Sequence, residues 1–103
     1  MRSGCAMPAE WTVPSDHPAF AGHFPGRPIV PGVVLLDQSL LRAGALPAGW
    51  RWCIAQAKFL RPVGPGEVLR WSFTATAPGA QRFAIHAGDA LVANGVLQQE
   101  AAA

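Results

Sequence analysis

Residues 23 to 37 read His-Phe-Pro-Gly-Arg-Pro-Ile-Val-Pro-Gly-Val-Val-Leu-Leu-Asp, a proline-rich segment that runs into an apolar helical pattern. Pro31 suits the first turn of a helix, because its missing N–H would have no intrahelical partner there. The aliphatic run that follows predicts one helix over residues 32–43, which ends near Gly44 and Pro47. We expect the fold to be built around this helix.

The rest of the chain is divided by proline and glycine turns into segments with strand character. In residues 71–75, Trp-Ser-Phe-Thr-Ala, large apolar side chains alternate with small polar ones, as in a strand with one packed face. The predicted strands cover residues 11–13, 51–60, 67–77, 80–86 and 91–98. This order predicts a single α+β domain over 1–103, in which one helix is covered by an antiparallel sheet, with flexible ends at 1–9 and 99–103.

The composition favours a chain that works with a second subunit. A length of 103 residues is one domain, which is short for an enzyme that encloses a substrate by itself. Only 14% of the residues are charged, whereas about 25% is usual, so part of the surface is expected to be an oligomer interface. The eight basic and six acidic residues are scattered without a basic block, which argues against nucleic acid as a partner.

Two further classes of protein are disfavoured by the sequence. Cys5 and Cys53 form neither a disulfide framework nor a metal-ligand spacing, and they are expected to be reduced thiols of a cytoplasmic protein. No apolar run reaches the length of a signal peptide or a membrane span, so neither export by that route nor a membrane partner is expected. The spacing of His17, His23 and Asp37 matches no zinc pattern, so we expect no metal and no cofactor.

Chemically useful groups gather in the opening segment. His23 is a candidate base, and three prolines at positions 25, 28 and 31 stiffen the loop that carries it. The backbone amides of Gly32 and Val33 come at the helix start, where the helix dipole favours a developing negative charge. Asp37 falls between aliphatic residues on the helix, so we expect it to be at least partly buried and able to act as an acid. Together these groups suit acid-base chemistry beside a carbonyl.

Simpler interpretations of both residues remain open at this point. His23 can be a loop histidine that satisfies backbone carbonyls. Asp37 can face solvent beside Gln38 and Arg42, as isolated helical aspartates commonly do.

The sequence also resembles a known family. Residues 17–33, His-Pro-Ala-Phe-Ala-Gly-His-Phe-Pro-Gly-Arg-Pro-Ile-Val-Pro-Gly-Val, look like the signature of the bacterial β-hydroxyacyl-acyl carrier protein dehydratases. Residues 58–67, Lys-Phe-Leu-Arg-Pro-Val-Gly-Pro-Gly-Glu, resemble the second recurring segment of that family. The short chain is most similar in size to the small dehydratase-like members of aryl polyene and other specialised lipid pathways.

The resemblance implies a hot-dog fold, a homodimer or larger oligomer with active sites between subunits, and no cofactor. It implies removal of water from a 3-hydroxyacyl thioester whose acyl group is carried on the phosphopantetheine of an acyl carrier protein, in fatty acid or polyene biosynthesis. By position, His23 and Asp37 match the catalytic pair, and Gly32 matches the amide that holds the thioester carbonyl.

Residues around this pair are expected to contact the substrate or its carrier. The substrate-contacting set is Gly32, Val33, Phe24 and Ile29. Further aromatic candidates for an acyl channel are Phe20, Trp71 and Phe73, and basic candidates for an acidic carrier or a phosphate are Arg27, Arg42, Lys58 and Arg61. A thioesterase on the same scaffold, and a non-catalytic acyl or carrier-binding module, are the alternatives.

Overall fold

The computed structural model describes residues 9–14 and 30–102 of the chain. It contains one helix and five strands in an order close to the predicted one. The elements are β1 Glu10–Thr12, α1 Gly32–Arg42, β2 Trp50–Phe59, β3 Val68–Ala77, β4 Ala80–Ala87 and β5 Ala90–Ala101. Each predicted element is present. Most of the observed starts and ends of these elements fall within one residue of the predicted positions.

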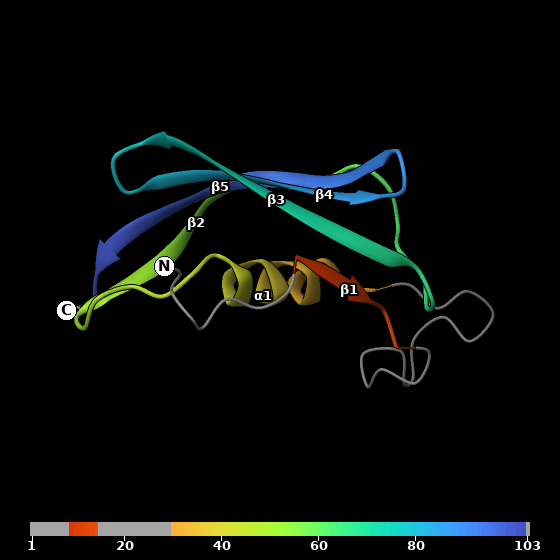
Figure 1. The fold of residues 1–103 in the computed structure, drawn as a ribbon, viewed down its shortest axis with the longest axis horizontal. Coiled ribbons are helices and arrows are strands. Elements are labelled where there is room, and N and C mark those ends of the chain that lie inside the picture. Colours follow the sequence, from red (N-terminus) through yellow and green to blue (C-terminus); the bar gives the residue numbers. More distant parts are fainter. Residues whose placement is uncertain (1–8, 15–29, 103) are drawn as a thin grey trace.

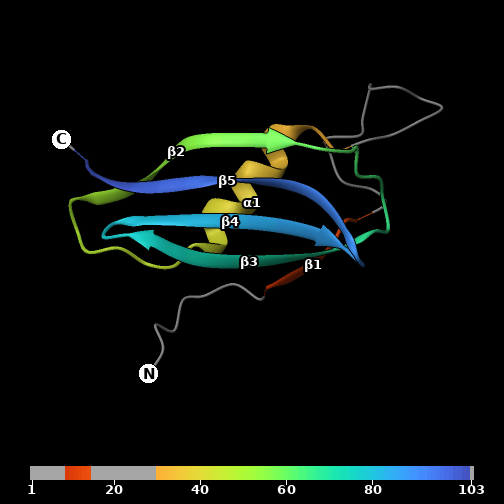
Figure 2. The same cartoon turned by 90° about the horizontal axis from the view of Figure 1, so that it is seen from above.

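The five strands form one antiparallel sheet in the order β1-β3-β4-β5-β2. Seen from above, the strands lie side by side and α1 crosses beneath them (Figure 2). Figure 1 shows the sheet curving over the helix, which lies against its concave face. This arrangement, one helix covered by a curled antiparallel sheet, is the predicted hot-dog fold.

The helix ends where the sequence predicted a stop. Ala43 is the C-cap and donates its N–H to the carbonyl of Leu40, at 3.3 Å. Gly44 follows with a φ of +105°, a left-handed conformation that glycine adopts without a steric penalty. The indole N–H of Trp52, on β2, then donates a 3.0 Å hydrogen bond to the carbonyl of Gly44. The chain after the helix is therefore fixed to the sheet.

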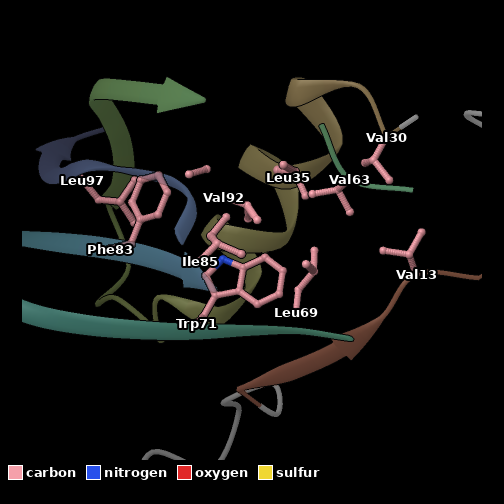
Figure 3. Close-up of a cluster of buried hydrophobic side chains, with 11 residues drawn as sticks. Val13, Val30, Leu35, Val63, Leu69, Trp71, Phe83, Ile85, Val92 and Leu97 are labelled. Atoms are coloured by element: carbon pink, nitrogen blue, oxygen red, sulfur yellow. The ribbon is translucent and has the colours of Figure 1, made fainter. Parts of the chain in front are cut away.

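The core fills the space between α1 and the sheet. Figure 3 shows its side chains converging from β3, β4 and β5 on the helix. The fully or nearly fully buried apolar residues are Val13, Val30, Leu35, Val63, Leu69, Trp71, Phe83, Ile85, Val92, Ala93 and Leu97. Burial of each large side chain contributes about 1.5–3 kcal/mol, which is the main force that holds the helix to the sheet.

The helix is rotated differently from the prediction, which placed Asp37 on the buried side. The buried face of α1 carries Leu35, Ser39 and Arg42. Asp37 is exposed in the single chain, on an outward stripe with Val33 and Leu41, whose exposed fractions are 62% and 55%. The expectation of burial within one chain was therefore wrong. The physical reason is that the helix carries aliphatic residues of its own on all sides, so the apolar pattern alone does not identify the face that packs on the sheet.

A second correction concerns the C-terminal residues. The sequence predicted flexibility from residue 99, but β5 continues to Ala101, which lies opposite Trp50 of β2. The N–H of Ala102 donates a further 2.7 Å hydrogen bond to the carbonyl of Gly49. Backbone pairing with β2 holds this end even though the alanine side chains bury little apolar area.

Within the parts of the chain that the structure covers, no helix is both long and apolar enough to cross a membrane.

Candidate active site

A cavity of about 450 Å³ opens beside the first turn of α1. It lies between the helix start and the segment that follows β2. Its lining is mostly apolar and consists of Val30, Gly32, Leu35, Phe59, Leu60, Arg61, Pro62 and Val63. A mostly apolar cavity with few polar groups is the usual form of a small-molecule site.

The cavity includes Gly32, the first residue of the helix, whose backbone amide is a potential donor. Pro31 is extended, with φ −60° and ψ 145°, and no side chain caps the helix. Among the described residues, the amides of Gly32 and Val33 have no hydrogen-bond acceptor. Since the first amides of a helix also carry the positive end of its dipole, a ligand oxygen in the cavity would be stabilised there.

The segment that leads into the helix is held in place by the cavity wall. The N–H of Val30 donates a 2.7 Å hydrogen bond to the carbonyl of Val63. Both side chains are buried, and Figure 3 shows them close together near Leu35. The direction in which the chain enters α1 is thereby fixed before any ligand is bound.

The ring of Phe59 lies directly against the backbone of Gly32. A Cβ atom added at Gly32 would be 2.8 Å from the Cζ atom of Phe59, closer than such atoms pack. An alanine at this position would therefore force the ring of Phe59 to shift. Phe59 itself is 48% exposed, so this aromatic side chain stands at the boundary between the cavity and solvent.

Arg61 supplies the charged group of the cavity lining. Its guanidinium donates a 2.8 Å hydrogen bond to the carboxylate of Glu67 and one of 2.9 Å to the carbonyl of Pro62. The same carboxylate accepts a 2.8 Å bond from the N–H of Gly64. The hydrogen bond from Arg61 lowers the pKa of Glu67, partly opposed by desolvation. Glu67 thus orients Arg61 at the cavity and closes the turn that precedes β3.

The structure separates the predicted site residues into two groups. Gly32 lines the cavity, whereas Val33 and Asp37 lie one helical turn apart on the outward stripe. His23, Phe24 and Ile29, together with Phe20 and Arg27, lie outside the described residues. The structure therefore neither brings His23 to Asp37 nor separates them.

Two predicted surface or channel residues belong to the interior instead. Arg42 is 6% exposed, so it is not available in the single chain to meet an acidic carrier. Its guanidinium lies 4.6 Å from the centre of the Trp71 ring, and burial lowers its pKa. Trp71 is 3% exposed and belongs to the core rather than to the cavity lining.

Most of the residues that line the cavity after β2 were not predicted from the sequence. Phe59, Leu60 and Val63 fall within the second segment on which the resemblance to the dehydratases rests, but only Lys58 and Arg61 were given a function there. The signal that could have revealed them was the sequence Arg61-Pro62-Val63, which directly follows the predicted strand 51–60. These three residues line the cavity.

A single helix beneath a curled antiparallel sheet, with an apolar cavity beside the helix start, places the chain in the hot-dog fold class. Residues 2–96 match the ApeI-like family, described as ApeI dehydratase. This match extends over nearly the whole chain. The chain therefore belongs to the ApeI-like dehydratase family.

Curated relatives carry related names. The chain is 38% identical to the 3-hydroxyacyl-[acyl-carrier-protein] dehydratase FabZ of Chlamydia trachomatis serovar L2, over 86% of this chain and 68% of that one. It is also 38% identical to FabZ of Syntrophotalea carbinolica, over 53% of this chain. That match covers only 44% of the Syntrophotalea protein, so the chain spans less than half the length of that relative.

Solved structures have the same fold. An uncharacterized protein from Erwinia carotovora subsp. atroseptica is 31% identical, with a TM-score of 0.72 over 90% of this chain and 81% of that one. The dehydratase heterocomplex ApeI:P from Xenorhabdus doucetiae gives a TM-score of 0.71 at 23% identity, over 87% of this chain and 82% of that one. The fluoroacetyl-CoA-specific thioesterase FlK has the fold too, with a TM-score of 0.58 at 13% identity over 87% and 83%. The fold is therefore shared by dehydratases and thioesterases.

Proposed function

We propose that this protein removes water from a 3-hydroxyacyl thioester to give the trans-2-enoyl thioester. The observation that carries the proposal is the amide of Gly32, which has no acceptor among the described residues and belongs to a residue that lines an apolar cavity. Such an arrangement suits a thioester whose carbonyl needs hydrogen bonds and whose acyl chain needs an apolar wall. The names of the FabZ relatives support the same reaction.

In this proposal three groups share the chemistry. His23 takes the α-proton of the substrate, and the amide of Gly32 donates to the thioester oxygen as negative charge develops on it. Asp37 gives a proton to the 3-hydroxyl group, which leaves as water. The contact at Gly32 strengthens in the transition state and is worth roughly 3–4 kcal/mol, because one oxyanion donor has about that value.

The outward position of Asp37 supports a site shared between two copies of the chain. An exposed carboxylate between Val33 and Leu41 is poorly placed for chemistry within one chain, because nothing excludes water from it. A second chain that covers this stripe would desolvate Asp37 and bring its own His23 to it. We therefore propose a homodimer in which each active site takes its histidine from one subunit and its carboxylate from the other.

The sheet offers a place for this second chain. Among the described residues, β2 is an edge strand that pairs only with β5. It is ten residues long and carries Trp50 and Phe59 with 48% exposure each. An unpaired strand of this length readily joins another strand, and pairing across the edge would continue the sheet into the second subunit. Larger assemblies would be built from such dimers.

The charge at the cavity supports a proposal for the substrate carrier. We propose that the acyl group arrives on the phosphopantetheine of an acyl carrier protein, that no further cofactor is needed, and that the reaction takes place in the cytoplasm. Arg61, at the cavity and oriented by Glu67, is the candidate for the phosphate or for an acidic carrier surface. The pathway would be fatty acid or polyene biosynthesis.

Mass spectrometry tests the reaction directly. The purified chain is incubated with 3-hydroxyacyl carrier-protein thioesters of several chain lengths, and the loaded acyl group is weighed while free thiol is monitored. The proposal predicts loss of one water that disappears in the His23→Ala variant. Release of free thiol would instead identify a thioesterase, and unchanged acyl groups at every chain length would identify a binding module.

A further inference from the structure

The rotation of α1 is not determined by its apolar residues. Six of its eleven residues are aliphatic, and at 100° per residue they lie on every side of the helix. Val33 and Leu41 flank Asp37 on the exposed side, whereas Val34, Leu36 and Leu40 are partly buried and pack against the core. Apolar burial is non-directional, and several rotations of this helix would satisfy it.

Directional contacts mark the face that is buried. The hydroxyl of Ser39, 0% exposed, accepts a 2.8 Å hydrogen bond from the indole N–H of Trp71 and donates one of 2.8 Å to the carbonyl of Leu35. Figure 3 shows Trp71 reaching from β3 toward the helix. A hydrogen bond between two side chains on different elements requires a narrow range of angles, so it fixes the helix against the sheet.

Arg42 provides a second directional contact one turn further on. Its guanidinium stacks on the Trp71 ring at 4.6 Å and donates to the carbonyl of Glu10 on β1, at 3.5 Å. It also donates to the backbone carbonyl and the side-chain oxygen of Gln38, at 3.2 and 2.6 Å. The helix is thus connected to β3 and to β1 from the same face.

Stability alone does not account for this cluster. Burial lowers the pKa of Arg42, which shows that its charge is poorly solvated where it lies. A buried charged group is therefore weak evidence for a gain in stability. The best-attested use of buried polar groups is to select one arrangement among several of similar energy.

We propose that Ser39, Arg42 and Trp71 are positioning residues that set the rotation of α1 and thereby direct Asp37 outward to its catalytic position. The inference rests on the proposed function of Asp37. Asp37 and the cluster are on opposite faces of one rigid helix, so a rotation that brought a leucine to the sheet would move the carboxylate away from the histidine of the second subunit. Val33, beside Asp37, would move with it.

The decisive variants remove the directional contacts of the cluster one at a time. Arg42→Met keeps the side-chain stem over Trp71 but lacks the guanidinium, and the double variant Ser39→Ala/Trp71→Phe removes donor and acceptor together. We expect kcat to fall by about 10- to 100-fold in both, because a displacement near 1 Å costs about that much. KM should change by less than about twofold.

A matched control separates positioning from general destabilisation. Ile85, 0% exposed on β4, belongs to the sheet side of the core, and Ile85→Val should lower the free energy of unfolding by about 1 kcal/mol while kcat stays unchanged. Full kcat in Arg42→Met and in the double variant would overturn the proposal. The proposal would also be overturned if kcat fell in Ile85→Val in the same proportion to the loss of stability as in the other variants.

A measurement made without substrate tests this inference separately from the proposed function. In nuclear magnetic resonance spectra, the indole N–H of Trp71 should exchange slowly with solvent and show cross-relaxation with Ser39, unlike the exposed indole of Trp50. In Arg42→Met these contacts should weaken as other helix residues approach Trp71. If the parent chain does not dehydrate a thioester, the proposed function fails; if the contacts of α1 persist unchanged in Arg42→Met, the positioning inference fails.

Discussion

The hydroxyl of Ser39 on α1 and the indole N–H of Trp71 on β3 form a 2.8 Å hydrogen bond in the interior of the protein. Both residues are buried, at 0% and 3% exposure. The bond satisfies the indole nitrogen, and no buried side-chain nitrogen or oxygen of the described residues lacks a partner. Helix and sheet are therefore joined by a polar contact within an otherwise apolar layer.

This contact predicts a non-additive effect on stability. Ser39→Ala leaves the indole N–H of Trp71 buried without an acceptor and should lower the free energy of unfolding by about 1–3 kcal/mol. In the Trp71→Phe background the same change should cost less, because no unpaired donor remains. Denaturant unfolding of the four proteins of this cycle measures the coupling. Strictly additive losses would mean that the two side chains do not interact.

The close approach of Phe59 to Gly32 predicts that the effect of Gly32→Ala on stability depends on the side chain at position 59. Gly32→Ala should destabilise the chain by about 1 kcal/mol, because the new Cβ would meet the ring of Phe59 at 2.8 Å. In a Phe59→Leu background the same substitution should be neutral or stabilising by up to about 1 kcal/mol, since alanine favours the helix over glycine. Thermal and denaturant unfolding measure both. An equal effect in the two backgrounds would rule out the contact.

The Arg61–Glu67 pair predicts a pH dependence of stability. The pKa of Glu67 is lowered in the folded state from its usual value of 4.5, so the unfolded chain binds a proton more readily. The carboxylate therefore stabilises the fold above about pH 4.5, and this contribution is lost as the pH falls through the lower, folded-state pKa.

Glu67→Gln measures this contribution. The variant should be less stable than the parent near pH 7, and the difference should shrink as the pH falls below 4.5 and Glu67 takes up its proton in the folded state. Glu100→Gln is the matched control, because Glu100 also pairs with an arginine, Arg51, but across an exposed part of the sheet. A Glu67→Gln effect that is constant with pH, or no larger than that of Glu100→Gln, would contradict the assignment.

Much of the fold could be predicted from the sequence. Glycine and proline turns separate the strands, and the start and end of α1 follow from Pro31 and Gly44. These signals are local, and local signals are the part of the fold that a sequence expresses most directly. The extension of β5 to Ala101 was missed because it depends on pairing with β2 rather than on the alanine side chains.

The candidate site was predicted in part. Gly32 lines the cavity, and its position follows from the proline that starts the helix, whereas its predicted contact with substrate stays a prediction. The exposure of Asp37 and the burial of Arg42 were not predicted, since they depend on the rotation of α1. That rotation is associated with Trp71 and Glu10, which are distant in the sequence, and no periodicity within the helix reveals it.

Complementation between two inactive variants tests the central claim, a dehydratase site built from His23 of one subunit and Asp37 of the other. His23→Ala and Asp37→Asn should each lower kcat for dehydration by about a hundredfold or more. After the two variants are unfolded together in equal amounts and refolded, about half of the dimers are mixed, and each mixed dimer has one intact site. The account predicts recovery of about one quarter of the parental rate. Mixed dimers that form, as shown by two different affinity tags, but remain as inactive as either variant would contradict it.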